Sequence, residues 1–371
     1  MKPIPFLRPC LPDPKLVARD YEEIFTSGVF TNGGARERAF ADALALRIAG
    51  DVGVSTTSSA TTGIQLACRA LFALDRPYAL IASFTFAAGP LALRWCGFEP
   101  VFLDIERDTW QPDLDAAEQF LVHESDGVAG ILLTNTFGTA NDSIERWEDL
   151  ARRFGLPLVI DSAAGFASEY SWGEVLGARG DCEIFSLHAT KIIGVGEGGA
   201  ISARDRAVIE HIDRLKNFGF DAAHNSLEVG TNAKLTEIAS AIGLRQLEAL
   251  PGRLMRRREV LRRYADSLRP LGVELQPGME RAAPPFVSAV LPTPGCRDLV
   301  GRALEHAGVG WRTYYNPPAH RQQSFAGARS VGDLSATDDI ASRVLSLPLH
   351  DDLSSESVAR IAGVVASEIR G

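Results

Sequence analysis

The sequence lacks the features of proteins that bind nucleic acid, span membranes or depend on disulfides. Lys and Arg number 38 against 47 Asp and Glu, which gives a formal net charge of −9, so no overall positive field would attract a nucleic acid. No apolar run approaches the length of a membrane span, and the proline-rich start is unlike a secretory signal. We therefore expect a soluble cytoplasmic protein that binds neither nucleic acid nor membranes.

Cysteine is scarce and scattered. The five cysteines lie far apart, show no paired metal-ligand spacing and are odd in number, which argues against a disulfide framework and against a metal site. We interpret them as buried or incidental thiols. The chain also lacks internal repeats and low-complexity tracts, and its 371 residues can bury one large core or two moderate ones.

Between about residues 50 and 205, short β-branched runs alternate with helical patterns. This alternation is typical of an α/β protein in which helices cover both faces of a mainly parallel sheet. Apolar residues from Ile64 to Leu71 recur at helical spacing, so a helix should begin near Ala60, directly after a strand. The expected strands are 52–56, 78–83, 100–104, 128–135, 157–161, 183–187 and 199–203.

Beyond Thr231 the pattern becomes largely helical, with extended segments at 287–291 and 345–349. We predict a large α/β domain over residues 35–245 and a smaller α/β domain over residues 246–371, which the N-terminal arm, residues 1–34, joins. The expected helices of this second half are 234–250, 253–268, 296–306, 338–345 and 356–369.

A lysine stands between an apolar strand and a glycine-rich turn. Residues 184–201 read IFSLHATKIIGVGEGGAI, with Lys191 after the strand and before the turn. A lysine in this position is partly desolvated, which lowers the pKa of its ammonium group and frees the amine to condense with an aldehyde. The alternative is an ordinary surface lysine whose stem packs along apolar neighbours.

An aspartate ends another apolar strand. Asp161 follows Leu158-Val159-Ile160, at the strand end where ligands bind in open α/β sheets. Its carboxylate could hold a pyridine nitrogen protonated and so make a cofactor ring an electron sink. The alternative is that Asp161 caps a following helix.

Residues 56–63, TTSSATTG, form a small hydroxyl-rich junction between a strand and a helix. Free backbone N–H groups and the helix dipole at such a junction favour a phosphate, although serine and threonine also cap helices that bind nothing. Phe86 follows the next strand and could stack on a flat ring; the alternative is an ordinary core aromatic.

In this order, these elements resemble the DegT/DnrJ/StrS family of pyridoxal phosphate (PLP)-dependent sugar aminotransferases over nearly the whole chain. The resemblance implies an aspartate-aminotransferase-like fold (fold type I), with PLP held as a Schiff base on Lys191 and pyridoxamine phosphate as its second form. The implied cofactor contacts are a phosphate loop at Ser59, Ala60 and Thr61, a further phosphate contact at Ser186, a stacking ring at Phe86 and a carboxylate under the ring nitrogen at Asp161.

Two later segments extend the resemblance. Residues 230–237, GTNAKLTE, resemble the segment through which a neighbouring subunit lends an asparagine, here Asn232, to the cofactor phosphate. The resemblance therefore implies a homodimer with shared active sites. Residues 314–320, YYNPPAH, also look like a family segment, and we expect Tyr315 and His320 to contact substrate.

One position departs from the family pattern. Where the family places a glutamine or histidine that reaches the cofactor's phenolic oxygen, this chain has Ala164, which cannot donate a hydrogen bond. Asn135 is our candidate substitute, because its strand should neighbour the strand ending at Asp161 and deliver both side chains to one edge of the sheet. The alternatives are that Asn135 caps the turn at 136–138 and that an ordered water is the donor.

The resemblance implies amino transfer from L-glutamate to a nucleotide-linked 4-keto-6-deoxyhexose in aminosugar biosynthesis. The strings HATK at 188–191 and EGG at 197–199 look more like enzymes that aminate carbon 4 than carbon 3, and dTDP-4-keto-6-deoxyglucose is the first candidate. Alternatives are carbon 3 of a ketosugar, a cyclitol or other non-nucleotide ketone, and a non-enzymatic regulatory protein of this fold. Either a diphosphate contact or a solvated helix face would explain Arg253, Arg256, Arg257 and Arg258.

Overall fold

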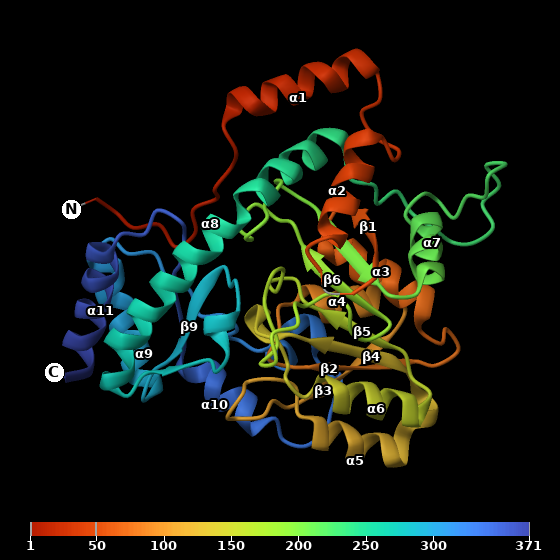
Figure 1. Ribbon diagram of the computed structural model, residues 1–371. Coiled ribbons are helices and arrows are strands. Elements are labelled where there is room, and N and C mark those ends of the chain that lie inside the picture. Colours follow the sequence, from red (N-terminus) through yellow and green to blue (C-terminus); the bar gives the residue numbers. More distant parts are fainter. Residues whose placement is uncertain (1, 49, 371) are drawn as a thin grey trace.

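The computed structural model describes residues 2–48 and 50–370. Met1, Ala49 and Gly371, which fall in the predicted arm, large domain and small domain, lie outside the described residues. An eight-stranded mixed sheet forms the centre, with the order β1-β7-β6-β5-β4-β2-β3-β10 (Figure 1). Its strands are β1 (Gly53–Thr57), β2 (Tyr78–Ala82), β3 (Glu99–Leu103), β4 (Val128–Thr134), β5 (Leu158–Asp161), β6 (Cys182–Ser186), β7 (Gly199–Ala203) and β10 (Arg329–Ser330).

This sheet is mainly parallel, as predicted. Within it, β7 runs antiparallel to β1 and β6, and the other described pairs are parallel. Each expected strand forms within one residue of its predicted ends, and α3 (Ala60–Leu71) begins at Ala60 directly after β1. The prediction of an α/β fold with a mainly parallel sheet is confirmed.

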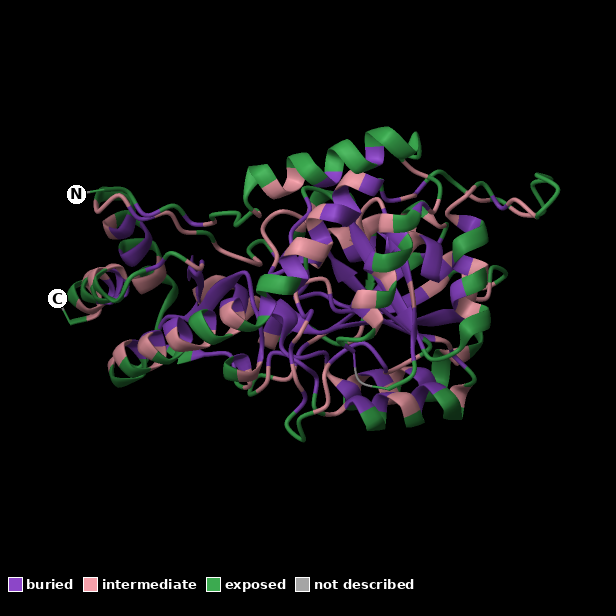
Figure 2. Cartoon of the chain, turned by 45° about the horizontal axis from the view of Figure 1, so that its top comes forward, coloured by how far each residue is buried: buried purple, intermediate pink, exposed green. Residues whose placement is uncertain are grey.

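Helices bury both faces of the sheet. In β5, Leu158 and Ile160 belong to one apolar cluster and Val159 to the other, as the two-residue period of a strand requires. Figure 2 shows the strands buried between helices whose outer surfaces are exposed. One cluster includes α2 (Ala35–Ala45), α5 (Leu114–Glu124), α6 (Ile144–Phe154) and the start of α8, and the other includes α3, α4 (Ala88–Trp95) and α7 (Arg206–Leu215).

A second, three-stranded antiparallel sheet has its own core. Ile4 of the N-terminal arm pairs with Val309 and contributes to this core. Both ends of the chain lie beside this sheet in Figure 1. Its elements are β8 (Glu274–Leu275), β9 (Phe286–Val290) and β11 (Val344–Pro348), which pack against α9 (Pro294–His306), α11 (Ser355–Arg370) and the end of α8, and α10 (Ser335–Arg343) precedes β11.

A single helix, α8 (Glu237–Leu268), contributes to both cores (Figure 1). The prediction of two helices, 234–250 and 253–268, is wrong, because Pro251 lies inside this helix. Proline removes the N–H that would bond the carbonyl four residues earlier, here that of Leu247, and the Arg47 guanidinium lies 3.5 Å from this oxygen. Apolar residues on both sides of the proline are buried, and their packing maintains the helix. The predicted domain boundary at 245/246 falls within α8 and stays a prediction.

α1 (Pro14–Ser27) lies against α8 at the edge of the molecule (Figure 1). Asp20 anchors it through an ion pair with Arg245, with 3.1 Å between Oδ2 and Nε. Most of the helix surface is exposed (Figure 2), including the rings of Tyr21 and Phe25. The arm therefore contacts two parts of the molecule, because Ile4 joins the small core and α1 packs on the first half of α8.

Among the described residues, no helix combines the length and the apolar character needed to cross a membrane. The cytoplasmic location stays a prediction. Short 3-10 helices complete the chain at Ser125–Gly127, Thr136–Gly138, Arg269–Leu271, Met279–Arg281, Ala319–Arg321 and Gln323–Phe325.

Candidate active site

A cavity of about 380 Å³ opens at the carboxyl ends of β4, β5 and β6, the edge where ligands bind in open α/β sheets. The start of α3, the turn after β6 and the segment that carries Tyr314 and Tyr315 form its walls. Two predicted site residues, Asn232 and His320, do not line it. The structure brings the others together there: Ser59, Ala60, Thr61, Phe86, Asn135, Asp161, Ser186, Lys191 and Tyr315.

Lys191 and Asp161 influence one another inside this cavity. Burial lowers the pKa of the Lys191 ammonium group to about 8, against an opposing effect of the Asp161 charge. Burial also raises the pKa of Asp161, although a hydrogen bond from the Ala163 N–H (3.0 Å) and the Lys191 charge oppose this rise. A desolvated amine near a buried carboxylate is suited to nucleophilic chemistry, unlike a surface lysine. The helix-capping alternative for Asp161 is wrong, because β5 leads into a turn.

The start of α3 has the features that favour an anion. The Ser59 and Thr62 side chains form a capping box, in which the Ser59 hydroxyl accepts from the Thr62 N–H at 3.1 Å, so serine does cap this helix. Within residues 2–48 and 50–370, the backbone N–H groups of Ala60 and Thr61 have no acceptor. The Ser186 hydroxyl accepts from the His188 N–H at 3.2 Å and can still donate. Free N–H groups at a helix N-terminus favour an anion.

Gly199 leaves room for the start of α3. A Cβ atom at this position would lie 2.7 Å from the backbone nitrogen of Ala60 and 2.6 Å from the Thr57 hydroxyl. Such contacts are far shorter than van der Waals separation, so a side chain at 199 would displace the first turn of α3. The glycine-rich turn after Lys191 therefore ends in a residue that the neighbouring helix start requires.

Aromatic rings form one wall of the cavity. The Phe86 side chain is 57% exposed and lines the cavity, so the core alternative for Phe86 is wrong. Its ring centroid lies 6.3 Å from that of Tyr315. The Tyr315 ring in turn stacks on Phe137, with 4.9 Å between centroids and 17° between planes. The wall offers a flat ligand ring an apolar face.

Asn135 makes its contacts within the protein. Strand β4 neighbours β5 as predicted, with Thr134 opposite Asp161, so Thr134 and Asp161 share one face and Asn135 follows on the other. The Asn135 amide nitrogen donates to Ser162 Oγ at 2.7 Å, and its side-chain oxygen accepts from the Asn141 N–H at 2.9 Å. These contacts support the alternative in which Asn135 stabilises the turn after β4. Its donation to a phenolic oxygen stays a prediction.

The buried side chain of Glu183 lies close to that of Asn135. The Glu183 carboxylate accepts hydrogen bonds from Gly177 N–H at 2.6 Å and from the Ser162 hydroxyl, and lies 3.4 Å from the Asn135 amide nitrogen. Burial raises the pKa of Glu183 to about 7, against these hydrogen bonds. The network joins Glu183, near the start of β6, to Ser162 and Asn135, which follow β5 and β4.

Asn232 and His320 lie outside the cavity. Asn232 is exposed, on the segment between α7 and α8 that extends from the body of the molecule (Figure 1). His320 faces the end of β2, where its Nδ1 lies 2.6 Å from the Ser83 hydroxyl and its Nε2 lies 3.2 Å from Asp338 Oδ1. These neighbours hold His320 outside the cavity described above, and its contact with substrate stays a prediction.

Two alternatives were given for the four arginines between residues 253 and 258, a diphosphate contact and a solvated helix face, and neither describes Arg253 and Arg257. Both are buried, and each forms an ion pair with Asp351, at 2.5 Å for Arg253 and 3.0 Å for Arg257. Their spacing of four residues places them on one face of α8, opposite the loop after β11. Of the other two, Arg258 pairs with Glu169 at 2.6 Å, and Arg256 is exposed.

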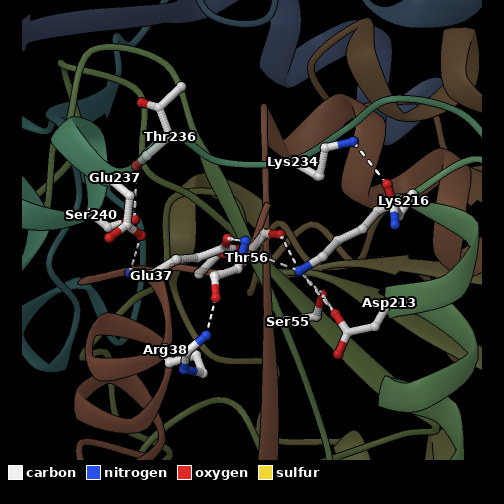
Figure 3. Close-up of polar contacts among 12 residues, drawn as sticks. Glu37, Arg38, Ser55, Thr56, Asp213, Lys216, Lys234, Thr236, Glu237 and Ser240 are labelled. Atoms are coloured by element: carbon white, nitrogen blue, oxygen red, sulfur yellow. Dashed lines mark hydrogen bonds and ion pairs between the residues drawn. The ribbon is translucent and has the colours of Figure 1, made fainter. Parts of the chain in front are cut away.

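A polar network supports the strand that leads to α3 (Figure 3). The Lys216 ammonium group lies 3.2 Å from the Glu37 carboxylate, 2.9 Å from Asp213 and 3.1 Å from the Thr56 carbonyl oxygen. The Glu237 carboxylate accepts from the backbone N–H groups of Arg36 and Glu37, at 2.9 and 2.8 Å, and so caps α2. Local sequence patterns do not indicate this network, because its members lie up to 201 residues apart.

The chain is similar to known aminotransferases. The profile of the DegT/DnrJ/EryC1/StrS aminotransferase family matches residues 15–366. The chain belongs to this family. It is 42% identical to protein Rv3402c of Mycobacterium tuberculosis (strain ATCC 25618 / H37Rv), over 99% of this chain and 91% of that protein. It is 29% identical to the dTDP-4-amino-4,6-dideoxy-D-glucose transaminase of Shigella dysenteriae, over 98% of each.

A solved structure shows the same fold. The crystal structure of DesI in the presence of its TDP-sugar product matches with a TM-score of 0.91 and 31% identity, over 100% of this chain and 93% of that chain. The predicted family, aspartate-aminotransferase-like fold, transaminase activity and PLP cofactor are therefore confirmed.

Several cavity residues of this aminotransferase were not predicted. The hydroxyls of Thr85 and Thr134 line the cavity 3.4 Å apart, and so do His188 and Glu197, with 3.6 Å between Nε2 and Oε1. Strand alternation could have identified Thr134, which shares a face with Asp161. Leu7 and Phe286 also line the cavity, but no local pattern connects either residue with the site.

Proposed function

We propose that this aminotransferase moves the amino group of L-glutamate to carbon 4 of a nucleotide-linked 4-keto-6-deoxyhexose, with dTDP-4-keto-6-deoxyglucose as the first candidate, in aminosugar biosynthesis. The observation that carries the proposal is a desolvated lysine near a buried aspartate, in a cavity that also contains an anion site. The Shigella relative is named for a dTDP-4-amino sugar, and DesI was solved with a TDP-sugar product. Both support a dTDP-linked substrate.

The residues of the cavity fit PLP. When bound, this cofactor supplies an aldehyde that condenses with amines and a ring that draws electrons from the carbon bearing the amino group. The N–H groups of Ala60 and Thr61 and the Ser186 hydroxyl would bind its phosphate. Asp161 would hold a proton on the ring nitrogen, and Phe86 would stack on the ring. Each of these residues lines the cavity.

Lys191 would perform two tasks. Its neutral amine would first hold the cofactor aldehyde. After the donor amine takes that place, the released Lys191 amine would carry a proton between the α-carbon of the donor and the aldehyde carbon of the cofactor. A lysine pKa of about 8 suits this work, because an acid–base group is most effective when its pKa lies near the working pH.

We further propose a homodimer in which Asn232 reaches the cavity of the partner subunit. Its exposure, and its position outside the cavity of its own chain, support this arrangement. If Lys191→Ala and Asn232→Ala proteins are both inactive, mixing them should restore activity, since exchange gives some heterodimers one intact site. Absence of recovery after verified subunit exchange would contradict a shared site.

A panel of ketosugar nucleotides with L-glutamate tests the substrate. We expect an aminated product from dTDP-4-keto-6-deoxyglucose, with the new amine on carbon 4 by NMR, and none from the Lys191→Ala protein. Amination at carbon 3, or of a cyclitol ketone alone, would support transaminase activity but contradict the proposed substrate. The regulatory alternative would require PLP-loaded protein to stay yellow after L-glutamate is added.

A further inference from the structure

Tyr315 lines the cavity. Its ring is fixed by Phe137, on which it stacks, and by Phe84, which it meets edge-on with 5.5 Å between centroids. Within the described chain, no group forms a hydrogen bond with the Tyr315 hydroxyl. Tyr264, which is fully buried, satisfies its hydroxyl by donating to the Pro348 carbonyl oxygen at 3.0 Å, whereas Tyr315 is only partly buried and lines the cavity. An immobilised hydroxyl that lacks a protein partner at a cavity is suited to a ligand oxygen.

The strand order gives the cavity a direction. The anion site lies at the start of α3 and at Ser186, which ends β6. Asp161 ends β5, the next strand, and Phe137 with Tyr315 lies past the end of β4, the strand after that. The cavity therefore runs from a phosphate-binding end, past a carboxylate, to the Tyr315 hydroxyl.

The substituents of PLP follow the same order. Its phosphate arm and its phenolic oxygen flank the aldehyde carbon on opposite sides, and the ring nitrogen lies across the ring. A ring bound by its phosphate at the β6 end and by its nitrogen at Asp161 turns the phenolic oxygen toward β4. The wall at β4 is where a donor to that oxygen must stand.

Other side chains at this wall are less suitable donors. Ala164 lines the cavity without a polar group. Asn135 directs its amide nitrogen to Ser162 and Glu183. The Thr134 hydroxyl faces the cavity but lies 3.4 Å from the Thr85 hydroxyl, so these two can serve each other.

We propose that Tyr315 donates a hydrogen bond to the phenolic oxygen of PLP, an inference that rests on the proposed function. It assigns Tyr315 to the cofactor and not to the substrate contact expected from the sequence. Burial, with a smaller effect of the Asp161 charge, raises the pKa of Tyr315, so the hydroxyl keeps its proton at working pH and remains a donor. A donor here competes with the proton on the Lys191 nitrogen for the charge of the phenolic oxygen.

The visible absorbance of PLP-loaded protein, titrated against pH, tests this role. Tyr315→Phe removes the hydroxyl and keeps the ring stacked on Phe137. Without the donor, the phenolic oxygen keeps more negative charge, so the proton on the Lys191 nitrogen should bind more tightly. The midpoint of the absorbance titration should then rise by about 1–2 pH units. Adding Ala164→Gln to Tyr315→Phe places an amide donor on the same wall and should return the midpoint toward that of the wild type.

Two single variants complete the experiment. Tyr314→Phe removes the same group from the neighbouring tyrosine, whose ring packs on Phe6 and Phe286, and should leave the midpoint unchanged. An unchanged midpoint in Tyr315→Phe, or a rise in Thr134→Val alone, would overturn the role of Tyr315. A wild-type protein that forms no yellow complex with PLP would instead overturn the proposed function itself, so the two failures are distinct.

Discussion

Replacing Asn135 with alanine should destabilise the protein while leaving the pH titration of bound PLP unchanged. The side-chain oxygen of Asn135 accepts the buried N–H of Asn141, and its amide donates to Ser162. Loss of the acceptor leaves that N–H without a partner, which costs about 1–3 kcal/mol, and loss of the second hydrogen bond costs about 1 kcal/mol more. We therefore expect a loss of about 2–4 kcal/mol in the free energy of unfolding.

Urea denaturation of the cofactor-free protein measures this loss. Asn225→Ala is the matched control, because Asn225 lies exposed in the loop near Asp221, where substitutions change stability by about 0.5 kcal/mol or less. A small stability change in Asn135→Ala together with a raised absorbance midpoint would refute our interpretation. Asn135 would then be the donor to the phenolic oxygen, as first predicted, and Tyr315 would not.

Three other predictions concern buried charges. The rate at which apoprotein turns yellow with PLP should rise with pH through a midpoint near 8, the pKa of Lys191, because only the neutral amine reacts. Asp161→Asn removes the charge that raises this pKa and should lower the midpoint. A midpoint above 10 would contradict a desolvated lysine. Glu183 has a folded-state pKa of about 7 against an ordinary 4.5, so its contribution to stability is complete below pH 4.5 and is lost as pH rises through 7. The stability of Glu183→Gln relative to the wild type, measured by the urea midpoints of the two proteins, should therefore increase between pH 5 and pH 8. A difference between the two midpoints that does not change with pH would refute the raised pKa of Glu183. Asp351→Ala leaves two buried arginines without their shared counter-charge and should cost about 3–5 kcal/mol by urea denaturation, whereas a loss near zero would show that these arginines reach solvent.

The sheet and the centre of the site could be predicted because their signals are local. A strand buried on both faces is a short apolar run, and β4 is buried at every position. Asp161 ends one such run and Lys191 follows another by five residues, so their place at the carboxyl edge follows from the strands themselves. The start of α3 was equally local, because a serine cap precedes a regular apolar stripe.

The predictions that were wrong or missing depend on partners distant in sequence. Pro251 is a strong helix breaker, yet burial on both sides of it maintains α8. Asp351, which pairs with Arg253 and Arg257, lies 94 or more residues away, so the arginine run gave no indication of burial. The position of Tyr315 beside Phe137 depends on how the segment after α9 packs across β4, which no local pattern specifies.

Transfer of nitrogen from donor to sugar is the central claim. PLP-loaded protein should be incubated with nitrogen-15-labelled L-glutamate and dTDP-4-keto-6-deoxyglucose, and the sugar nucleotide analysed by mass spectrometry. We predict labelled amino sugar with the wild type and none with Lys191→Ala. Unlabelled sugar nucleotide, in a protein whose yellow colour bleaches with L-glutamate, would contradict the proposed acceptor and leave a transaminase for another ketone.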